Sequence, residues 1–264
     1  MAYIIPAPGE KYKKNIVVTL YGTRSYEKCR SHEGYDKGDE HNDLKEIYDG
    51  LLQHKWQGLG IFRGQQATAA KAEEIFRKAD FLMIGGHGKT AAVWPGQRPY
   101  IYAAKLDSEA RQCRWLLVAA CSEVQVANPQ GQQDLSNESP YRWLKANPFL
   151  HAVLGYQGGA AWYGDMVNAK SAGARFATEL HQGKTVTEAW MDANKFYAPD
   201  APAGFGVRSA ATFSLQDNDG DMVGTPDAFP TAQAVDRTHF VYKMLTQDAG
   251  LYFRTFMPHK RLIL

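Results

Sequence analysis

The sequence contains few cysteines, and their spacing follows no pattern. The 264-residue chain has three, at Cys29, Cys113 and Cys121, which is an odd number without a CxxC pair. Disulfide frameworks and zinc clusters need paired cysteines at short, regular spacings. The sequence therefore argues against both, and we expect free thiols, no metal site and no cofactor.

Long hydrophobic runs and an excess of one charge are also missing. Pro6 and Pro8 interrupt the first apolar stretch, and no later stretch is long enough to span a membrane. Lys and Arg number 30 against 28 Asp and Glu, which leaves a net charge of +2. A nucleic-acid binder would need a basic surface to neutralise phosphates. We expect a cytoplasmic protein with neither nucleic acid nor a membrane among its partners.

Motifs that would assign other chemistries are absent or incomplete. GxSxG, HExxH and GxxxxGK[ST] do not occur. Gly58, Gly60 and Gly64 have the wrong spacing for a dinucleotide loop. Residues 217–221 resemble the start of a calcium loop, but Ala228 stands where such loops end in glutamate. A plain turn rich in Asp and Asn is the favoured interpretation.

Apolar runs alternate with helical patterns along most of the chain, which is typical of a mostly parallel sheet flanked by helices. The predicted strands are residues 16–21, 58–63, 81–84, 100–104, 115–120, 151–156 and 207–215, and the predicted helices are residues 44–52, 72–79, 141–145, 166–180 and 185–193. We expect a single α/β domain over residues 1–264, with its core at about 15–216 and a C-terminal extension at 217–264. Within that extension, the pattern from His239 to Tyr252 suggests an edge strand or a short helix.

Two chemically useful residues follow the ends of predicted strands. His87 and Gly88 come after the strand that ends near Ile84, and Cys121 comes directly after the apolar run ending at Ala120. The carboxyl ends of parallel strands meet at one edge of the sheet, where ligands bind. A thiol has a reference pKa of ~8.5 and needs a neighbouring base, which imidazole supplies. The pattern predicts a Cys121–His87 dyad, with an oxyanion hole formed by the amides of Gly88 and Cys121.

These strand ends, FLMIGGHG and WLLVAACS, resemble those of the caspase, legumain and gingipain (clan CD) superfamily of cysteine peptidases. Residues 150–190 are similar to the strand and helix pair that follow the cysteine in bacterial caspase-like proteins. The resemblance implies a three-layer α-β-α sandwich with a caspase-like fold. It also implies a substrate pocket, with these members: Arg24, Gln157, Trp162, Tyr163 and Asp165. Because Ala-Ala-Cys-Ser-Glu replaces the caspase Gln-Ala-Cys-Arg-Gly signature, aspartate specificity is not implied.

More than one function remains compatible with these patterns. Taken alone, Cys121 could be a buried core cysteine, and only its pairing with His87 favours a catalytic thiol. As an enzyme, the protein would act on a peptide or small-molecule amide or ester, by hydrolysis or by acyl transfer in biosynthesis. Alternatively, it would be a binding or scaffold protein that keeps the fold without turnover. The oligomeric state is left open.

Overall fold

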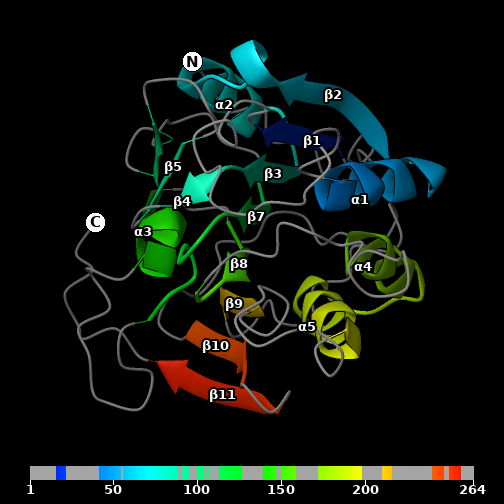
Figure 1. Cartoon of the computed structure of the whole chain (residues 1–264), viewed down its shortest axis with the longest axis vertical. Coiled ribbons are helices and arrows are strands. Elements are labelled where there is room, and N and C mark those ends of the chain that lie inside the picture. The colour runs from blue at the N-terminus through cyan, green and yellow to red at the C-terminus, as the bar shows by residue number, and fades with distance from the viewer. Residues whose placement is uncertain are drawn as a thin grey trace, which may run out of the picture.

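A mostly parallel sheet separates two groups of helices (Figure 1). The computed structural model describes residues 16–21, 42–54, 56–88, 91–94, 100–103, 106, 113–126, 139–146, 150–158, 172–197, 210–215, 240–246 and 250–256. Side chains are described for most of these residues, and His87, Trp94 and the strand at 16–21 are described by their backbone.

The main sheet of the described residues has eight strands in the order β11-β10-β9-β8-β7-β3-β1-β2. Its parallel part consists of β1 (Ile16–Tyr21), β2 (Gln57–Arg63), β3 (Phe81–Gly85), β7 (Trp115–Ala119) and β8 (Ala152–Tyr156). Three antiparallel strands extend it, namely β9 (Ala210–Leu215), β10 (Phe240–Leu245) and β11 (Leu251–Phe256). A small antiparallel sheet is formed by β4 (His87–Gly88), β5 (Ala92–Trp94) and β6 (Ile101–Tyr102).

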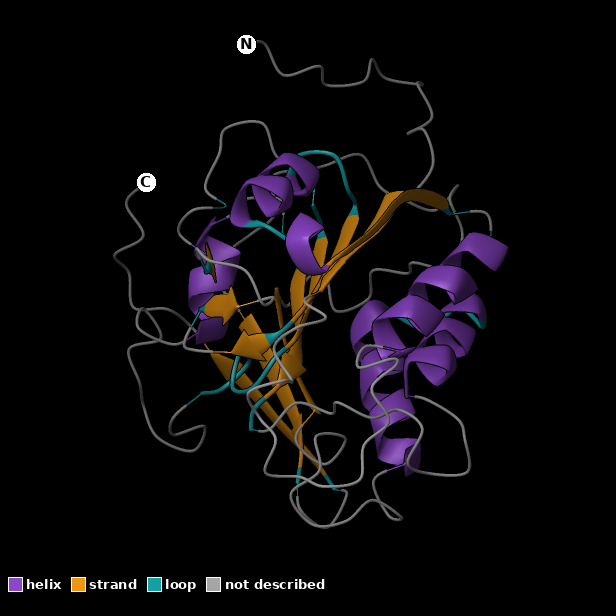
Figure 2. Cartoon of the chain, turned by 45° about the horizontal axis from the view of Figure 1, so that its top comes forward, coloured by secondary structure: helices purple, strands orange, loops and turns teal. Residues whose placement is uncertain are grey.

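The two faces of the main sheet pack against different helices (Figure 2). On one face lie α2 (Ala69–Phe76) and α3 (Ser139–Ala146), and on the other lie α1 (Asn42–Gln53), α4 (Ala172–His181) and α5 (Val186–Tyr197). Successive residues of β7 alternate between these faces. Leu116 and Val118 belong to the first core cluster, on the α2/α3 face, and Leu117 and Ala119 belong to the second core cluster, on the α1/α4/α5 face. Burial on both faces explains the continuous apolar runs of the central strands.

The predicted fold class, an α/β three-layer sandwich with a mostly parallel sheet, is confirmed. Each predicted strand and helix overlaps an observed element. The C-terminal segment differs from the expectation, because residues 240–256 form two strands, β10 and β11, where one edge strand or a short helix was expected. Both strands pair into the main sheet, since β10 hydrogen-bonds to β9.

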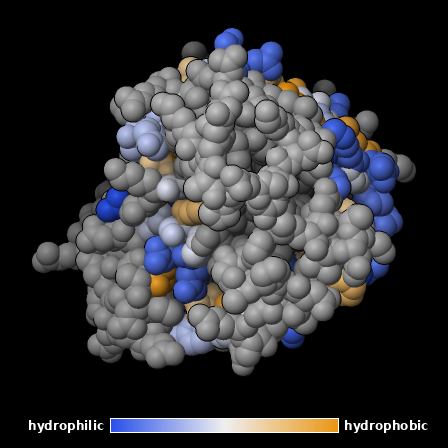
Figure 3. Space-filling model, in the orientation of Figure 1, coloured by the Kyte–Doolittle hydropathy of each residue, from blue (hydrophilic) through white to orange (hydrophobic). Residues whose placement is uncertain are grey.

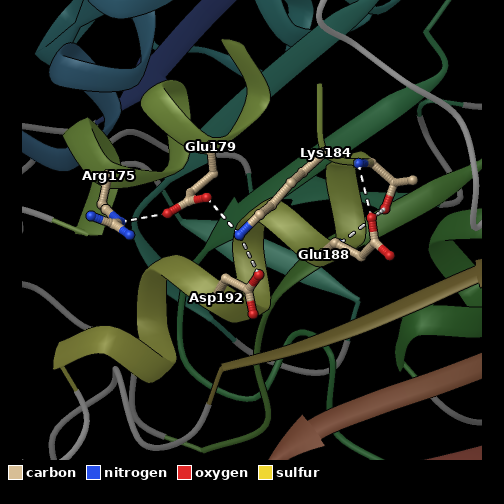
Figure 4. Close-up of polar contacts among 6 residues, drawn as sticks. Arg175, Glu179, Lys184, Glu188 and Asp192 are labelled. Atoms are coloured by element: carbon tan, nitrogen blue, oxygen red, sulfur yellow. Dashed lines mark hydrogen bonds and ion pairs between the residues drawn. The ribbon is translucent and has the colours of Figure 1, made fainter. Parts of the chain in front are cut away.

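Local sequence signals explain how α4 ends and α5 begins. Gly183 has φ of 90° and ends α4, a left-handed position that favours glycine. Thr185 and Glu188 form a reciprocal capping box, in which each backbone amide donates to the other side chain at 3.2 Å. The buried carboxyl group of Glu179 on α4 pairs with Lys184, which also pairs with Asp192 on α5, so this lysine ties the two helices together (Figure 4).

The described surface over α1 is mainly hydrophilic, with small hydrophobic areas between (Figure 3). Among described residues the large hydrophobic side chains with substantial exposure are Leu52, Leu59, Tyr102, Phe196 and Leu251. They are distributed over five different elements. In the part of the chain that the structure describes, no helix combines the length and the apolar character needed to cross a membrane.

Candidate active site

Parallel pairing of β3 with β7 brings the two predicted dyad residues to the same edge of the sheet. The last register pair joins Gly85 of β3 to Ala119 of β7. His87 and Cys121 each lie two residues beyond that pair. The amide of Gly86 donates to the Ala119 carbonyl at 3.3 Å, so the segment after β3 remains hydrogen-bonded to the end of β7. The topology therefore places both backbones beyond the carboxyl ends of two adjacent strands.

Gly88 and Cys121 are in direct backbone contact. An ideal Cβ atom on Gly88 would lie 2.0 Å from the carbonyl oxygen of Cys121 and 2.8 Å from its amide nitrogen. Separations below 3.0 Å do not occur for real Cβ atoms, so the chain path requires glycine at this position. This contact brings β4, which begins with His87, against the residue that carries the candidate nucleophile.

The turn that follows β7 holds Cys121 at the edge of the sheet. Ser122 has φ of 60°, a left-handed conformation that is unfavourable for a residue other than glycine. Two backbone hydrogen bonds support the turn, one from the Ser122 amide to the carbonyl of Gly158, just after β8, at 2.8 Å, and one from the Val124 amide to the carbonyl of Tyr156, the last residue of β8, at 3.1 Å. The strained conformation is thus anchored on both sides of Glu123.

The two cysteines with described positions lie in different environments. Cys121 is only partly buried, and it packs against the second core cluster, on the α1/α4/α5 face. Cys113 is fully buried, its thiol donates to the Trp115 carbonyl at 3.2 Å, and burial raises its pKa well above the ordinary value for a thiol. A thiol with a raised pKa is a poor nucleophile at neutral pH. Cys121 is therefore the more accessible of these two thiols.

Of the predicted pocket residues, Gln157 lies within the described part of the chain. It follows β8, and its Oε1 atom accepts a hydrogen bond from the Tyr242 hydroxyl at 3.0 Å. Tyr242 belongs to the first core cluster, whereas Cys121 packs against the second. Arg24, Trp162, Tyr163 and Asp165 lie outside the described residues. The substrate-binding roles of all five residues stay predictions.

The structure adds one residue that the sequence did not identify. Glu123 is completely buried, and its Oε2 atom accepts hydrogen bonds from Ser139 Oγ at 3.2 Å and from Trp143 Nε1 at 2.9 Å. A signal was present, because Glu123 is a charged residue within a mainly apolar segment, two positions after Cys121. Within the described ranges, three or more His, Cys, Asp or Glu side chains nowhere gather closely enough to hold a metal ion.

Comparisons with known proteins give a family and distant structural likenesses. Residues 62–240 match the family model described as "Domain of unknown function (DUF6345)". A search of curated proteins finds no match.

Solved structures resemble the chain only distantly. The Arg-specific cysteine proteinase gingipain R (RgpB) has a TM-score of 0.48 and 11% identity, over 92% of this chain and 67% of that one. The complex of Porphyromonas gingivalis RgpB pro- and mature domains has a TM-score of 0.40 and 12% identity, over 92% and 68%. A diacylglycerol kinase from Bacillus anthracis str. Sterne has a TM-score of 0.28 and 13% identity, over 89% and 74%. Similarity at these levels says nothing about the activity of this chain.

Proposed function

Since this chain belongs to the DUF6345 family, whose description assigns no activity, we propose from its own geometry that it is a cysteine-dependent hydrolase or acyl transferase. Its substrate would be a peptide or a small molecule with an amide or ester bond. The backbone contact between Gly88 and Cys121 carries the proposal. It supports a site in which the histidine-bearing strand and the cysteine-bearing turn act on one substrate carbonyl.

In the first half of the reaction, His87 takes the proton from the Cys121 thiol, and the sulfur attacks the substrate carbonyl carbon. The carbonyl π bond opens, and its oxygen becomes an oxyanion held by the amides of Gly88 and Cys121. Losing one such donor typically costs roughly 3–4 kcal/mol of transition-state stabilisation. When the oxyanion collapses, the amide or ester bond breaks, and His87 returns the proton to the leaving amine or alcohol. The acyl group is left as a thioester on Cys121.

In the second half, water or an amine attacks the thioester while His87 accepts its proton. The carbon–sulfur bond breaks, and Cys121 leaves as a thiolate that is reprotonated from His87. Water as acceptor gives hydrolysis and an amine gives acyl transfer, so one dyad serves both reactions. Cys121 is only partly buried, whereas Cys113 is fully buried, and this supports access of such acceptors to Cys121.

The experiment that tests the proposal is the pH dependence of Cys121 alkylation by iodoacetamide, mapped by peptide mass spectrometry. Wild type is compared with His87→Ala. A dyad makes Cys121 react below the pH expected of a free thiol with a pKa of ~8.5, and the His87 change removes that advantage. If the two profiles coincide, the thiolate dyad is refuted, and the protein is better regarded as a binding protein.

A further inference from the structure

The buried carboxyl group of Glu123 is the starting point for a second inference, which rests on the proposed function. Removing a carboxyl group from water is strongly unfavourable unless hydrogen bonds replace its hydration. Glu123 is completely buried and accepts bonds from Ser139 and Trp143, both on α3. Its position in the chain, between the strained Ser122 and Val124, means that these bonds hold the turn of Cys121 against α3.

Ser139 extends this connection to the strand that pairs with the His87 strand. Its hydroxyl donates to Glu123 and accepts a hydrogen bond from the Ala91 amide at 2.7 Å. Ala91 immediately precedes β5, whose Val93 and Trp94 are the register partners of Gly88 and His87. The path from Glu123 through Ser139 to Ala91 therefore links the two halves of the proposed site.

Backbone strain at both ends of this path supports a positioning role. Ala91 has φ of 57° and Ser122 has φ of 60°, and a left-handed conformation costs a residue other than glycine roughly 1–2 kcal/mol. Such conformations persist where the surrounding structure holds them in place, and they gather at functional sites. The Ser139 hydroxyl binds the amide of one strained residue, and the Glu123 carboxyl group lies next to the other in sequence.

We infer that Glu123 is a positioning residue for the dyad: through Ser139 it fixes the β4–β5 hairpin that carries His87 against the turn that carries Cys121. The described hydrogen bonds of Glu123 go to α3, whose Trp143 belongs to the first core cluster, whereas Cys121 packs against the second cluster. Glu123 thus acts on the dyad through the backbone of the residues before and after it. Misplacing catalytic groups by about 1 Å can lower a rate by about a hundredfold, so loss of this link has a chemical consequence.

The sharpest test replaces Ser139, because Ser139→Ala breaks the link and keeps Glu123. Thr185→Ala is a control with the same pattern of hydrogen bonds at a more exposed position. The Thr185 hydroxyl also accepts from a backbone amide, that of Glu188, and donates to a carboxyl group, that of the same residue, at 3.2 and 2.9 Å. Thr185 directly precedes α5, shortly after α4 ends. The end of α4 lies near the start of β2, because His181 of α4 stacks on His54, which precedes β2. Thr185 is therefore near the amino ends of the parallel strands, whereas Cys121 lies beyond the carboxyl end of β7.

Both variants are compared with wild type and His87→Ala in the alkylation experiment, and hydrogen exchange is measured on peptides that contain Ala91–Val93. We expect Ser139→Ala to speed exchange in these peptides and to lower Cys121 alkylation at about pH 6 by about tenfold, toward the His87→Ala rate. Thr185→Ala should change neither quantity by more than about twofold, because the hydrogen bonds of its hydroxyl, to Thr187 and Glu188, stay within the first turn of α5. Glu123→Gln, which keeps an acceptor oxygen, should behave more like wild type than Glu123→Ala.

The outcomes separate the two proposals. If wild type and His87→Ala react alike, the proposed function fails, and the positioning role fails with it. If wild type depends on His87 and Ser139→Ala keeps the wild-type alkylation profile, the positioning role alone is overturned. If Glu123→Ala does not fold, the pair Ser139→Ala and Thr185→Ala still decides between these results.

Discussion

Gly88 and Cys121 lie so close that a single methyl group on Gly88 would collide with the Cys121 backbone. The two residues are far apart in sequence and meet because β3 and β7 are adjacent parallel strands. A methyl group at Gly88 would have to displace a carbonyl and an amide, which are less adjustable than the end of a flexible side chain. The contact therefore controls the separation between the His87 strand and the Cys121 turn.

Gly88→Ala is expected to separate these segments. Overpacking typically lowers the free energy of unfolding by about 1–3 kcal/mol, and it should also lower the rate of Cys121 alkylation near neutral pH. Gly50→Ala is the control, because its Cβ would lie 2.6 Å from Ala177 Cβ at the contact between α1 and α4, away from the proposed site. Denaturant unfolding and alkylation are measured on both. Equal loss of Cys121 reactivity in the two variants would contradict the local effect.

Cys113 should be inert in the native protein. Its thiol is fully buried, and desolvation raises its pKa, so almost no thiolate is present at neutral pH. We expect iodoacetamide to modify Cys113 only after unfolding by denaturant, as measured by peptide mass spectrometry on native and denatured samples. Rapid native labelling of Cys113 would show that the core around β7 opens locally.

Stability is expected to fall as the pH drops below the ordinary pKa of histidine. His54, at the end of α1, stacks on His181 of α4 with ring centroids 3.5 Å apart. Desolvation, and then the charge of His181, lower the pKa of His54 below its ordinary value of 6.5. The unfolded chain therefore binds the proton first, so folding stability is lost as the pH falls from 6.5 through the lower folded pKa.

Denaturant unfolding at several pH values, in wild type and His54→Asn, measures this loss. The variant lacks the titrating group and should show a shallower decrease between neutral and mildly acidic pH. His181→Asn should have a partial effect, because desolvation, the larger cause of the shift, remains. A decrease as steep in His54→Asn as in wild type would assign the pH dependence to other groups.

Glu179 should contribute more to stability than Asp192, although both pair with Lys184 (Figure 4). The Glu179 side chain is 1% exposed and pairs with Arg175 and Lys184 at 2.5 and 2.6 Å, whereas that of Asp192 is 47% exposed. Glu179→Gln should lower the free energy of unfolding by about 1–3 kcal/mol, since the buried side chain loses the charge that pairs with Arg175 and Lys184. Asp192→Asn should change it by less than about 0.5 kcal/mol. If denaturant unfolding gave similar losses of free energy for the two variants, the burial of Glu179 would not explain its contribution to stability.

Local patterns predicted the elements that carry the site. The apolar runs before His87 and Cys121 indicated buried strands, and β3 and β7 occupy them. The Thr185–Glu188 capping box depends on neighbours in the sequence as well, since both partners lie within one helical turn. The missed features depend on distant partners. The hairpin of β10 and β11 follows β9 after a long stretch, and its pairing with that strand has no local signal.

The sequence by itself determined the α/β class, the strands that end near His87 and Cys121, and the capping of α5, because period, composition and short-range hydrogen bonds act within a few residues. Only the tertiary structure decided that Gly88 touches Cys121 and that Glu123 is buried beneath the turn and linked through Ser139 to Ala91. These contacts join segments far apart in the chain. Their formation depends on the order of the strands in the sheet and on close packing of the helices against its faces. Neither can be derived from the periodicity of any one segment.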